Sequence, residues 1–361
     1  MKKRSLLKMI FSLLLCLSMT TIMFNSCSDC DVPEILTEVT DIAINPSGEI
    51  SVEIGKTTTL TATVMPDNAT NKDIIWSSLR NNIATVDAQT GVVTGVSTGT
   101  ATIRATAADG SGITANKIVT VTIPEPEMIF VKGGTFTMGC TSEQGYDCDN
   151  NERPTHQVTL SDYYIGKYQV TQEQWIAIMG SNPSYFKGDN FPVEQVSWHD
   201  IIGHLGKYEV INGIRYYENG FIYKLNAATG KKYRLPTESE WEYAARGGNQ
   251  SKGFKYSGSN NANDVAWYFT QNGTRPVGTK QANELGIYDM SGNVSEWCSD
   301  WHGNYTDTSK NNPTGPSNGL HPVARGGSWL YGERLSRVSA RFQHNQFSRI
   351  YDFGFRLALV P

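Results

Sequence analysis

The chain has 361 residues, of which 39% are apolar and 11% aromatic, and its formal net charge is −4. This length allows two or three folded domains with ordinary cores, and the composition is that of globular rather than disordered protein. Acidic and basic residues are scattered along the chain, so no basic stripe indicates nucleic acid as a partner. Composition and charge therefore predict a modular globular protein but do not identify its ligand.

The N-terminus is typical of an export signal. Three basic residues at positions 2–4 precede a largely apolar run over residues 6–24. A charged start followed by an apolar stretch of this kind is the pattern of a secretory signal peptide. We therefore interpret residues 1–26 as a signal peptide and expect the protein to be exported.

A cysteine follows the apolar run directly. The sequence Asn-Ser-Cys at 25–27 resembles a loose bacterial lipobox, in which the cysteine is acylated and becomes the mature N-terminus. We expect Cys27 to carry the lipid and residues 27–37 to form a tether; Cys30 is the alternative anchor, and a simple cleaved signal is the other reading. Acidic residues after the anchor favour the outer membrane and the cell surface as the location; they are Asp29, Asp31 and Glu34.

Three cysteines remain in the exported part of the chain. Cys140 and Cys148 flank a short polar loop, and in an oxidising compartment they could close a disulfide across it. Cys298 would then be a buried free thiol. Spacing alone does not establish the disulfide geometry.

Residues 38–122 consist of short β-branched runs separated by turn residues, which is the pattern of an all-β sandwich. The motifs occur in the order WSS at 76–78, ATVD at 84–87, GVVTG at 91–95 and GTATI at 99–103. This succession resembles the bacterial Ig-like group 2 domain, which implies a spacer. The proline-containing segment 123–127 is expected to be a stiff linker.

The last domain is expected to span residues 128–361. It begins with a predicted strand, turn and strand, and two helices are predicted at 171–179 and 237–246. Thr237 and Glu240 form the pattern of a capping box at the start of the second helix. The rest is rich in Gly, Asn, Trp and Tyr, which indicates short strands and long loops.

Six motifs follow one another through this domain. They are FVKGGTFTMG at 130–139, a long motif from Thr-His-Gln to Gln-Trp at 155–175, PVEQVSW at 192–198, YRLPTESEWEYAARGG at 233–248, GIYDMSGNVSEW at 286–297, and RGGSW at 325–329 with GFRL at 354–357. Their order resembles the formylglycine-generating enzyme, or sulfatase-modifying factor, family. The resemblance implies an irregular α+β domain related to C-type lectins, so the fold class is multidomain: an all-β Ig-like sandwich followed by this α+β domain.

The family's oxidases hold copper with two cysteines shortly after the Arg-Gly-Gly-Ser segment. Thiolates suit copper(I), but here no cysteine follows Ser328. We therefore expect no copper and no catalytic residues. His199 and His204 are the only histidines at a spacing that suggests a metal, and they lack a suitable carboxylate arrangement. The alternatives are an enzyme of the family with an unrecognised site and a structural accessory lipoprotein of the envelope.

Calcium is the one metal that the resemblance implies. Family members bind it through a Gly-Asn-x-x-Glu-Trp turn, which matches residues 292–297. Asn293 and Glu296 would supply oxygen ligands, with backbone carbonyls completing the shell. The alternative is a turn held by Asx-type hydrogen bonds without an ion.

The segment between the RGGSW and GFRL motifs is rich in large apolar and aromatic residues, where many relatives place asparagines. It resembles the variable proteins of diversity-generating retroelements, in which copying errors at adenines convert asparagine codons to others. Glu333, Gln343 and Gln346 do not fit such an origin, and packing of a divergent core edge is the alternative. The residues that fit are the predicted contacts for a protein or glycan ligand: Leu330, Tyr331, Leu335, Phe342, His344, Ser348, Ile350, Tyr351 and Asp352.

Overall fold

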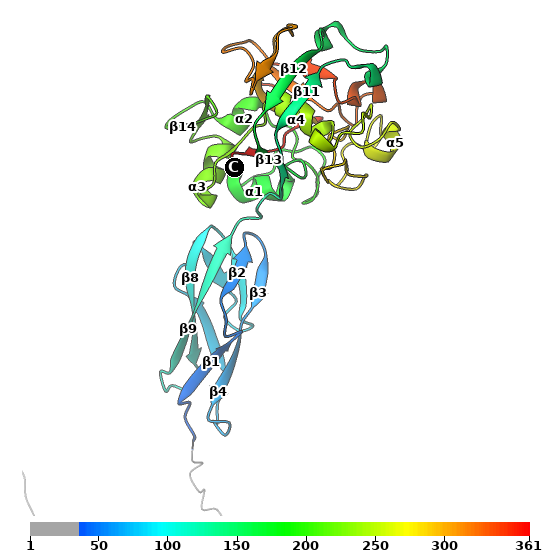
Figure 1. The fold of residues 1–361 in the computed structure, drawn as a ribbon. Coiled ribbons are helices and arrows are strands. Elements are labelled where there is room, and N and C mark those ends of the chain that lie inside the picture. Colours follow the sequence, from blue (N-terminus) through cyan, green and yellow to red (C-terminus); the bar gives the residue numbers. More distant parts are fainter. Residues whose placement is uncertain (1–35) are drawn as a thin grey trace, which may run out of the picture.

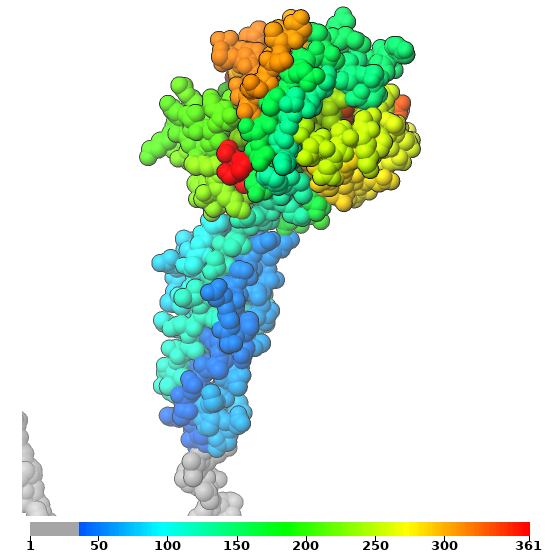
Figure 2. All heavy atoms as spheres, viewed as in Figure 1, coloured from blue at the N-terminus to red at the C-terminus, as the bar shows by residue number. Residues whose placement is uncertain are grey.

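The computed structural model describes residues 36–361, which form a slender β stalk and a larger, rounded head (Figure 1). The head is wider than the stalk and sits on one end of it, while the described chain begins at the opposite end (Figure 2). The predicted signal peptide at 1–26 and the predicted lipidation site Cys27 lie outside the described residues. Between residues 36 and 361 no helix is long and apolar enough to cross a bilayer.

The stalk is an Ig-like β sandwich, which confirms the predicted fold class. Its main sheets have the orders β2-β9-β8-β5 and β3-β7-β6, and β1 pairs with β4. Alternate residues of β8 face inward, so Ile103 is buried with Trp76 and Leu60 in one apolar cluster. The strands are β1 (Asp41–Asn45), β2 (Ile50–Glu53), β3 (Thr57–Thr59), β4 (Thr61–Met65), β5 (Ile74–Ser78), β6 (Ala84–Val86), β7 (Val92–Gly95), β8 (Gly99–Ala107) and β9 (Thr114–Thr122).

Few residues connect the stalk to the head. Strand β9 ends at Thr122 and the first head strand begins at Met128. Ile123 is buried against the apolar core of the head, and Lys56 Nζ of the stalk lies 2.6 Å from Glu173 Oε1 of the head. The ion pair is partly exposed and contributes at most about 1 kcal/mol, so apolar packing at Ile123 is the firmer part of this junction.

The head is built from short strands and long connections. Its sheets have the orders β10-β13-β22-β16, β11-β12-β18 and β20-β19-β17-β21, and β14 and β15 form a separate hairpin. The last strands of the chain, β21 and β22, thus lie beside strands from much earlier in the sequence. The strands are β10 (Met128–Val131), β11 (Gly134–Met138), β12 (His156–Leu160), β13 (Tyr163–Gly166), β14 (Tyr208–Ile211), β15 (Ile214–Tyr217), β16 (Tyr233–Arg234), β17 (Ser295–Trp301), β18 (Lys310–Asn311), β19 (Pro322–Arg325), β20 (Arg341–Gln343), β21 (Phe353–Gly354) and β22 (Ala358–Leu359).

The two predicted helices are confirmed as α1 and α4, with the predicted first residue of each serving as its N-cap. Thr237 Oγ1 accepts a hydrogen bond from Glu240 N at 3.1 Å, and the Glu240 carboxylate accepts one from Thr237 N at 2.9 Å, so the predicted capping box is formed. The helices are α1 (Gln172–Met179), α2 (Trp198–Ile202), α3 (Phe221–Thr229), α4 (Glu238–Ala245) and α5 (Ala262–Val265), with 3-10 turns η1 (Ser142–Gln144), η2 (Asn150–Glu152), η3 (Gly248–Gln250) and η4 (Glu333–Ser336).

The cap of α1 gives a first prediction. Thr171 Oγ1 accepts a hydrogen bond from Gln174 N at 3.3 Å, and Thr171→Ala leaves that amide unpaired at the helix start. We expect the free energy of unfolding in urea to fall by about 1 kcal/mol. The exposed Ser181, just beyond the same helix, provides the matched control, because Ser181→Ala removes a hydroxyl that caps nothing. Equal effects of the two substitutions would contradict the role of the cap.

Candidate ligand-binding site

The C-terminal segment of the head runs from the end of β19 to β21 and is fixed at both ends by buried arginines. Arg325 lies in β19, is fully buried and pairs with Glu242 of α4. Arg356 follows β21, is also fully buried, and its Nε and Nη2 lie 2.6 and 2.7 Å from the carboxylate oxygens of Glu296. A buried charge persists only when it is paired and hydrogen-bonded, so these pairs hold both ends of the segment in place.

The side chains of the two predicted calcium ligands form hydrogen bonds with other protein groups. Besides Arg356, the Glu296 carboxylate accepts hydrogen bonds from Trp241 Nε1 at 2.7 Å and from Gln169 Nε2 at 2.9 Å. The Asn293 side chain accepts from Arg275 N at 3.0 Å and donates to Arg275 O at 3.1 Å.

A calcium ion needs several free oxygen ligands, whereas Glu296 and Asn293 are both fully buried and already satisfied. As they lie in this structure, the two side chains therefore do not fit a calcium site. Their hydrogen bonds stabilise the turn instead. Among residues 36–361, no group of three or more His, Cys, Asp or Glu side chains is placed to hold a metal ion.

The nine predicted ligand contacts lie at three depths in the structure. Tyr331, His344 and Tyr351 are exposed. Phe342 and Ile350 pack partly against the core of the head, which agrees with the alternative interpretation that this segment packs a divergent core edge. The half-buried members are Leu330, Leu335, Phe342, Ser348 and Ile350, and the fully buried member is Asp352.

Asp352 is the member that the structure removes from the predicted contact set. It is fully buried, and its Oδ2 accepts a hydrogen bond from Ser328 Oγ at 2.8 Å. Its backbone carbonyl accepts one from Ser295 N at 2.8 Å, beside the pairing of β17 with β21. Asp352 therefore positions the chain inside the head, and a ligand on the surface does not reach it.

Exposed aromatic side chains gather beside the two ends of the segment. Large exposed aromatic groups are costly to leave in water and commonly mark an interaction site when they cluster. Two of them come from the segment, and two come from loops that are distant in the sequence. We call this set the aromatic surface, and its members are Tyr185, Phe269, Tyr331 and Tyr351, exposed by 69%, 78%, 42% and 41%.

Trp329 joins these loops from beneath. Its ring lies 5.6 Å from that of Tyr351 and 5.3 Å from that of Phe186, and Phe186 in turn lies 5.0 Å from the ring of Tyr185. A backbone hydrogen bond connects the loop that carries Phe269 to the same set, because Phe269 N donates to the Tyr331 carbonyl at 3.0 Å. The aromatic surface thus rests on an aromatic layer formed by the buried Trp329 and the half-buried Phe186, which limits its freedom to rearrange.

Tyr185 and Phe269 were not among the predicted contacts. Both lie in loops whose place in the head depends on distant pairings, such as the hydrogen bond from Thr270 N to the Trp329 carbonyl. Phe269 has a φ of +45°, which is a strained conformation for a bulky residue. Only the run of aromatic residues at 185 and 186 in an otherwise polar loop was visible in the sequence, and it does not specify exposure.

Two carboxyl groups lie under the same aromatic layer. Glu194 Oε1 accepts a hydrogen bond from Phe186 N at 2.8 Å, whereas Glu194 Oε2 and Asp352 Oδ1 have no partner among residues 36–361. Burial raises the pKa of Glu194 to about 7 and also raises the pKa of Asp352. The Asp352 carboxyl adds to this rise in the pKa of Glu194, so the layer is most stable when Glu194 carries a proton.

This arrangement predicts a stability that falls as pH rises. Because the pKa of Glu194 is higher in the folded protein than in the unfolded chain, its contribution is fully present below its unfolded pKa and is lost as pH rises through about 7. Glu194→Gln should therefore flatten the decline of the unfolding free energy between about pH 5 and pH 8 by about 2 kcal/mol. Urea titrations at several pH values measure this, with the exposed Glu49→Gln as control. An unchanged slope in Glu194→Gln would contradict the assignment.

Cys298 and the histidine pair identified from the sequence have structural surroundings. Cys298 is a free thiol that is fully buried, and burial raises its pKa well above the usual range, so it is a poor nucleophile. The rings of His199 and His204 lie 5.1 Å apart, but His199 Nε2 bonds to Gln346 Oε1 at 3.0 Å and its ring packs on Phe347 at 4.5 Å. His199 therefore supports the loop after β20.

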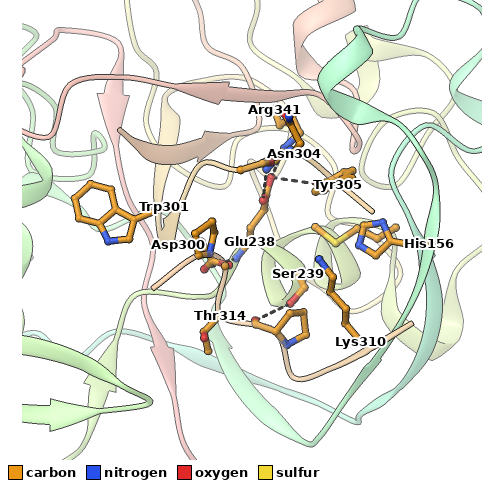
Figure 3. A pocket seen from close by; sticks show the side chains of 15 residues that line it. His156, Glu238, Ser239, Asp300, Trp301, Asn304, Tyr305, Lys310, Thr314 and Arg341 are labelled. Atoms are coloured by element: carbon orange, nitrogen blue, oxygen red, sulfur yellow. Dashed lines mark hydrogen bonds and ion pairs between the residues drawn. The ribbon is translucent and has the colours of Figure 1, made fainter. Parts of the chain in front are cut away.

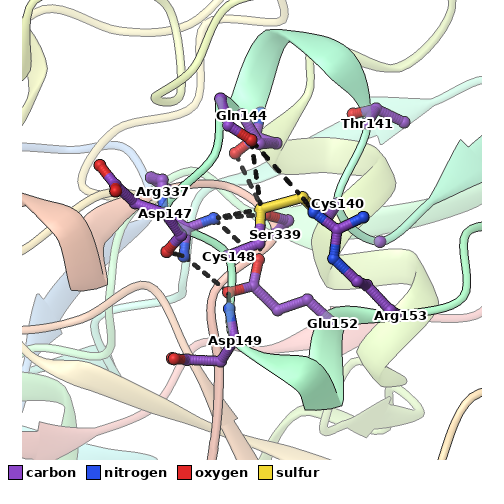
Figure 4. Close-up of a disulfide and its surroundings, with 12 residues drawn as sticks. Cys140, Thr141, Gln144, Asp147, Cys148, Asp149, Glu152, Arg153, Arg337 and Ser339 are labelled. Atoms are coloured by element: carbon purple, nitrogen blue, oxygen red, sulfur yellow. Dashed lines mark hydrogen bonds and ion pairs between the residues drawn. A yellow bond between two sulfur atoms is a disulfide. The ribbon is translucent and has the colours of Figure 1, made fainter.

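Cys140 and Cys148 form a disulfide (Figure 4). It closes the loop that leads into η2, where the Glu152 carboxylate receives Arg337 Nη2 and Nη1 at 2.6 and 2.8 Å. Arg337 Nη1 also lies 3.2 Å from Cys148 Sγ. Glu152 and Arg337 are both fully buried, so the disulfide loop and the C-terminal segment are fastened to each other through this pair.

Comparisons with known proteins decide the family. A model of the sulfatase-modifying factor enzyme 1-like domain matches residues 114–360, and a model of the bacterial Ig-like domain (group 2) matches residues 38–118. The chain belongs to the sulfatase-modifying factor family. In the structure, residues 114–122 form β9 of the stalk, so the family domain proper begins after that strand.

The chain is similar to proteins with different names. It is 38% identical to the chaperone protein LppX of Paenibacillus barcinonensis over 63% of this chain and 88% of that protein. It is 30% identical to the serine/threonine-protein kinase pkn1 of Chlamydia caviae, over 65% of this chain but only 38% of the kinase. The formylglycine-generating enzyme of Thermomonospora curvata is 26% identical, over 65% of this chain and 93% of that enzyme.

A solved structure is also similar. The Treponema denticola variable protein 1 matches with a TM-score of 0.54 and 32% sequence identity, covering 65% of this chain and 95% of that protein. The head is thus similar both to enzymes and to a protein named as variable, so membership of the family alone does not establish catalysis.

Proposed function

We propose that this family member is an exported lipoprotein whose stalk displays a non-catalytic binding head at the cell surface, with the aromatic surface as the contact for a protein ligand. The exposed cluster of Tyr185, Phe269, Tyr331 and Tyr351 carries the proposal. Tyrosine and other aromatic side chains are enriched among residues that dominate protein interfaces. The aromatic layer under them favours a preformed contact surface, which lowers the entropy lost on binding.

The arrangement of the molecule supports display. The described chain begins at the end of the stalk that lies away from the head (Figure 1). A lipid on Cys27, which the sequence predicts, would therefore hold the stalk at the membrane and the head above it. Metabolic labelling with a palmitate analogue tests the proposed anchor. The wild type should be labelled, and Cys27→Ser should not.

We also propose that the C-terminal segment is diversified. Its flanks are fixed by buried pairs, while Tyr331, His344 and Tyr351 are exposed between them. Deep sequencing of the codons for residues 325–357 from a population of source cells tests this. We expect substitutions at the three exposed positions and none at Asp352, Arg325 or Arg356, because those side chains are buried. A uniform population would contradict diversification.

Binding is tested separately from variation. A photoreactive benzophenone amino acid at position 331 should form cross-links to a discrete protein on the cells or in their surroundings. The control position is 208, because Tyr208 is an aromatic residue of similar exposure, 49%, on the β14–β15 hairpin. Cross-linking at 208 alone, or at neither position, would contradict the aromatic surface as the contact.

The family's enzymes provide the opposing function. No cysteine follows Ser328, and Cys298, which precedes it, is buried, so thiolate ligands for copper are missing from the place where the family carries them. Conversion of a cysteine-containing sulfatase peptide by the purified protein in the presence of copper, together with stoichiometric copper by metal analysis, would overturn the non-catalytic proposal.

A further inference from the structure

A pocket of about 370 Å³ lies away from the aromatic surface and shares none of its residues. It opens between the start of α4, the end of β17 and the connection that follows β17 and returns through β18 (Figure 3). In Figure 2 this connection, in orange, stands at the top of the head. The volume is within the range of small-molecule sites in proteins.

The floor of the pocket is fixed by the fold. The Glu238 carboxylate accepts hydrogen bonds from Arg341 Nε and Nη2 at 2.7 and 2.6 Å, and from Tyr305 Oη at 3.2 Å. The Arg341 guanidinium also covers the Tyr305 ring at 3.9 Å. These three side chains satisfy one another, so they shape the pocket and leave ligand binding to other groups.

Other polar atoms at the pocket have no hydrogen-bond partner among residues 36–361. Asp300 is 4% exposed, and its Oδ2 accepts hydrogen bonds from Glu238 N at 3.0 Å and Ser299 Oγ at 2.9 Å. No hydrogen bond to Asp300 Oδ1 is formed within residues 36–361, and in the same range Lys310 Nζ has no carboxylate within 4.0 Å. The side chains of Asn304 and Thr314 make no hydrogen bond there either. All of them line one cavity (Figure 3).

These free groups have complementary roles. Asp300 Oδ1 accepts hydrogen bonds when the carboxyl is ionised and can donate one when it is protonated, and burial raises the pKa of Asp300 to about 7. Lys310 only donates hydrogen bonds, and Asn304 and Thr314 do both. A cationic ligand would be repelled by Lys310, and an anionic ligand would be repelled by the ionised form of Asp300. Neighbouring hydroxyl groups, which donate and accept, can satisfy both residues without a net charge.

Part of the remaining lining is apolar. It comes from the side chains of Met138, Pro313 and Pro316, which suit the C–H faces of a ring. We propose that this pocket binds a neutral hexose ring, with Asp300 and Lys310 holding neighbouring hydroxyl groups. This inference is independent of the aromatic surface, because the two sites share no residue.

Ligand-observed saturation-transfer NMR on the purified protein tests the proposal with methyl glucoside, methyl galactoside and methyl mannoside as probes. At least one of them should receive saturation. Lys310→Met should weaken its affinity about tenfold, and this substitution should not disturb the fold because the ammonium has no carboxylate partner. Asp300→Asn should have an effect of similar size, with its folding checked by thermal unfolding.

The exposed Lys252→Met removes the same charge elsewhere on the head and is the control that should keep the affinity. Tyr331→Ala should also keep it, which separates this pocket from the aromatic surface. Absence of transfer to all three hexosides would overturn the proposal, as would equal binding by the wild type and Lys310→Met. Transfer to methyl glucuronate alone would also overturn it, because that outcome would assign an anionic ligand.

Discussion

Replacing Arg356 with methionine is expected to lower the free energy of unfolding by about 3 to 5 kcal/mol. Arg356 and Glu296 are both fully buried, and the Arg356 guanidinium also donates to the carbonyls of Gly166 at 2.8 Å and Tyr288 at 2.9 Å. Methionine fills a similar volume but leaves the Glu296 carboxylate without its counter-charge in the interior. The cost arises from that unpaired charge more than from lost contacts.

Urea unfolding of the wild type and Arg356→Met measures this difference. Arg349 provides a matched control, because it also pairs with a carboxylate in two bonds, to Asp200 at 2.7 and 2.6 Å, but its side chain is 65% exposed. Arg349→Met should cost less than about 1 kcal/mol. If the two substitutions had the same effect, burial of the Arg356 pair would not be what stabilises this part of the head.

Removing the disulfide should have the second largest effect. Cys140 and Cys148 are eight residues apart, and closing a loop of this length corresponds to about 2 to 3 kcal/mol of unfolding free energy. The double variant Cys140→Ser, Cys148→Ser also releases the loop that presents Glu152 to Arg337. We therefore expect a loss of at least this size, with faster hydrogen exchange of the amides in η4 and β20.

The same experiment contains its control. A reductant should destabilise the wild type and should leave the double variant unchanged, because Cys298 is the only other cysteine among the described residues and is already a free thiol. Destabilisation of the double variant by the reductant would mean that another thiol reaction was being measured. Equal stability of the oxidised wild type and the double variant would contradict the structural role of the disulfide.

Local patterns predicted much of the fold. The stalk strands alternate buried and exposed residues, and the caps of α1 and α4 rest on bonds between residues three apart. Such signals depend on neighbours in the sequence, so they are readable without a structure. The order of the head sheets is not readable in this way, because strands as short as β21 and β22, of two residues each, carry almost no pattern of their own.

The candidate site was predictable only in part. Tyr331 and Tyr351 were identified from the sequence as unusual residues and are exposed, whereas Asp352 is one residue further along and fully buried. Residue type does not distinguish these positions; the pairing of β21 with β17 does. Similarly, Glu296 and Asn293 have suitable oxygen atoms for calcium, but Arg356 and Arg275, which come from other parts of the chain, already engage them.

The position of β21 and β22 determines which mutations in the C-terminal segment still allow the head to fold. Strand β22 lies between β13 and β16, and β21 pairs with β17. A premature stop codon or a frameshift within residues 330–352 removes both strands and the Arg356 partner of Glu296, so the head would be left with open sheet edges and a buried unpaired charge. Copies with such lesions should be degraded before display. A missense change at an exposed position leaves every strand in place, so under the proposed function variants with altered binding would still be displayed, whereas truncated chains would be eliminated.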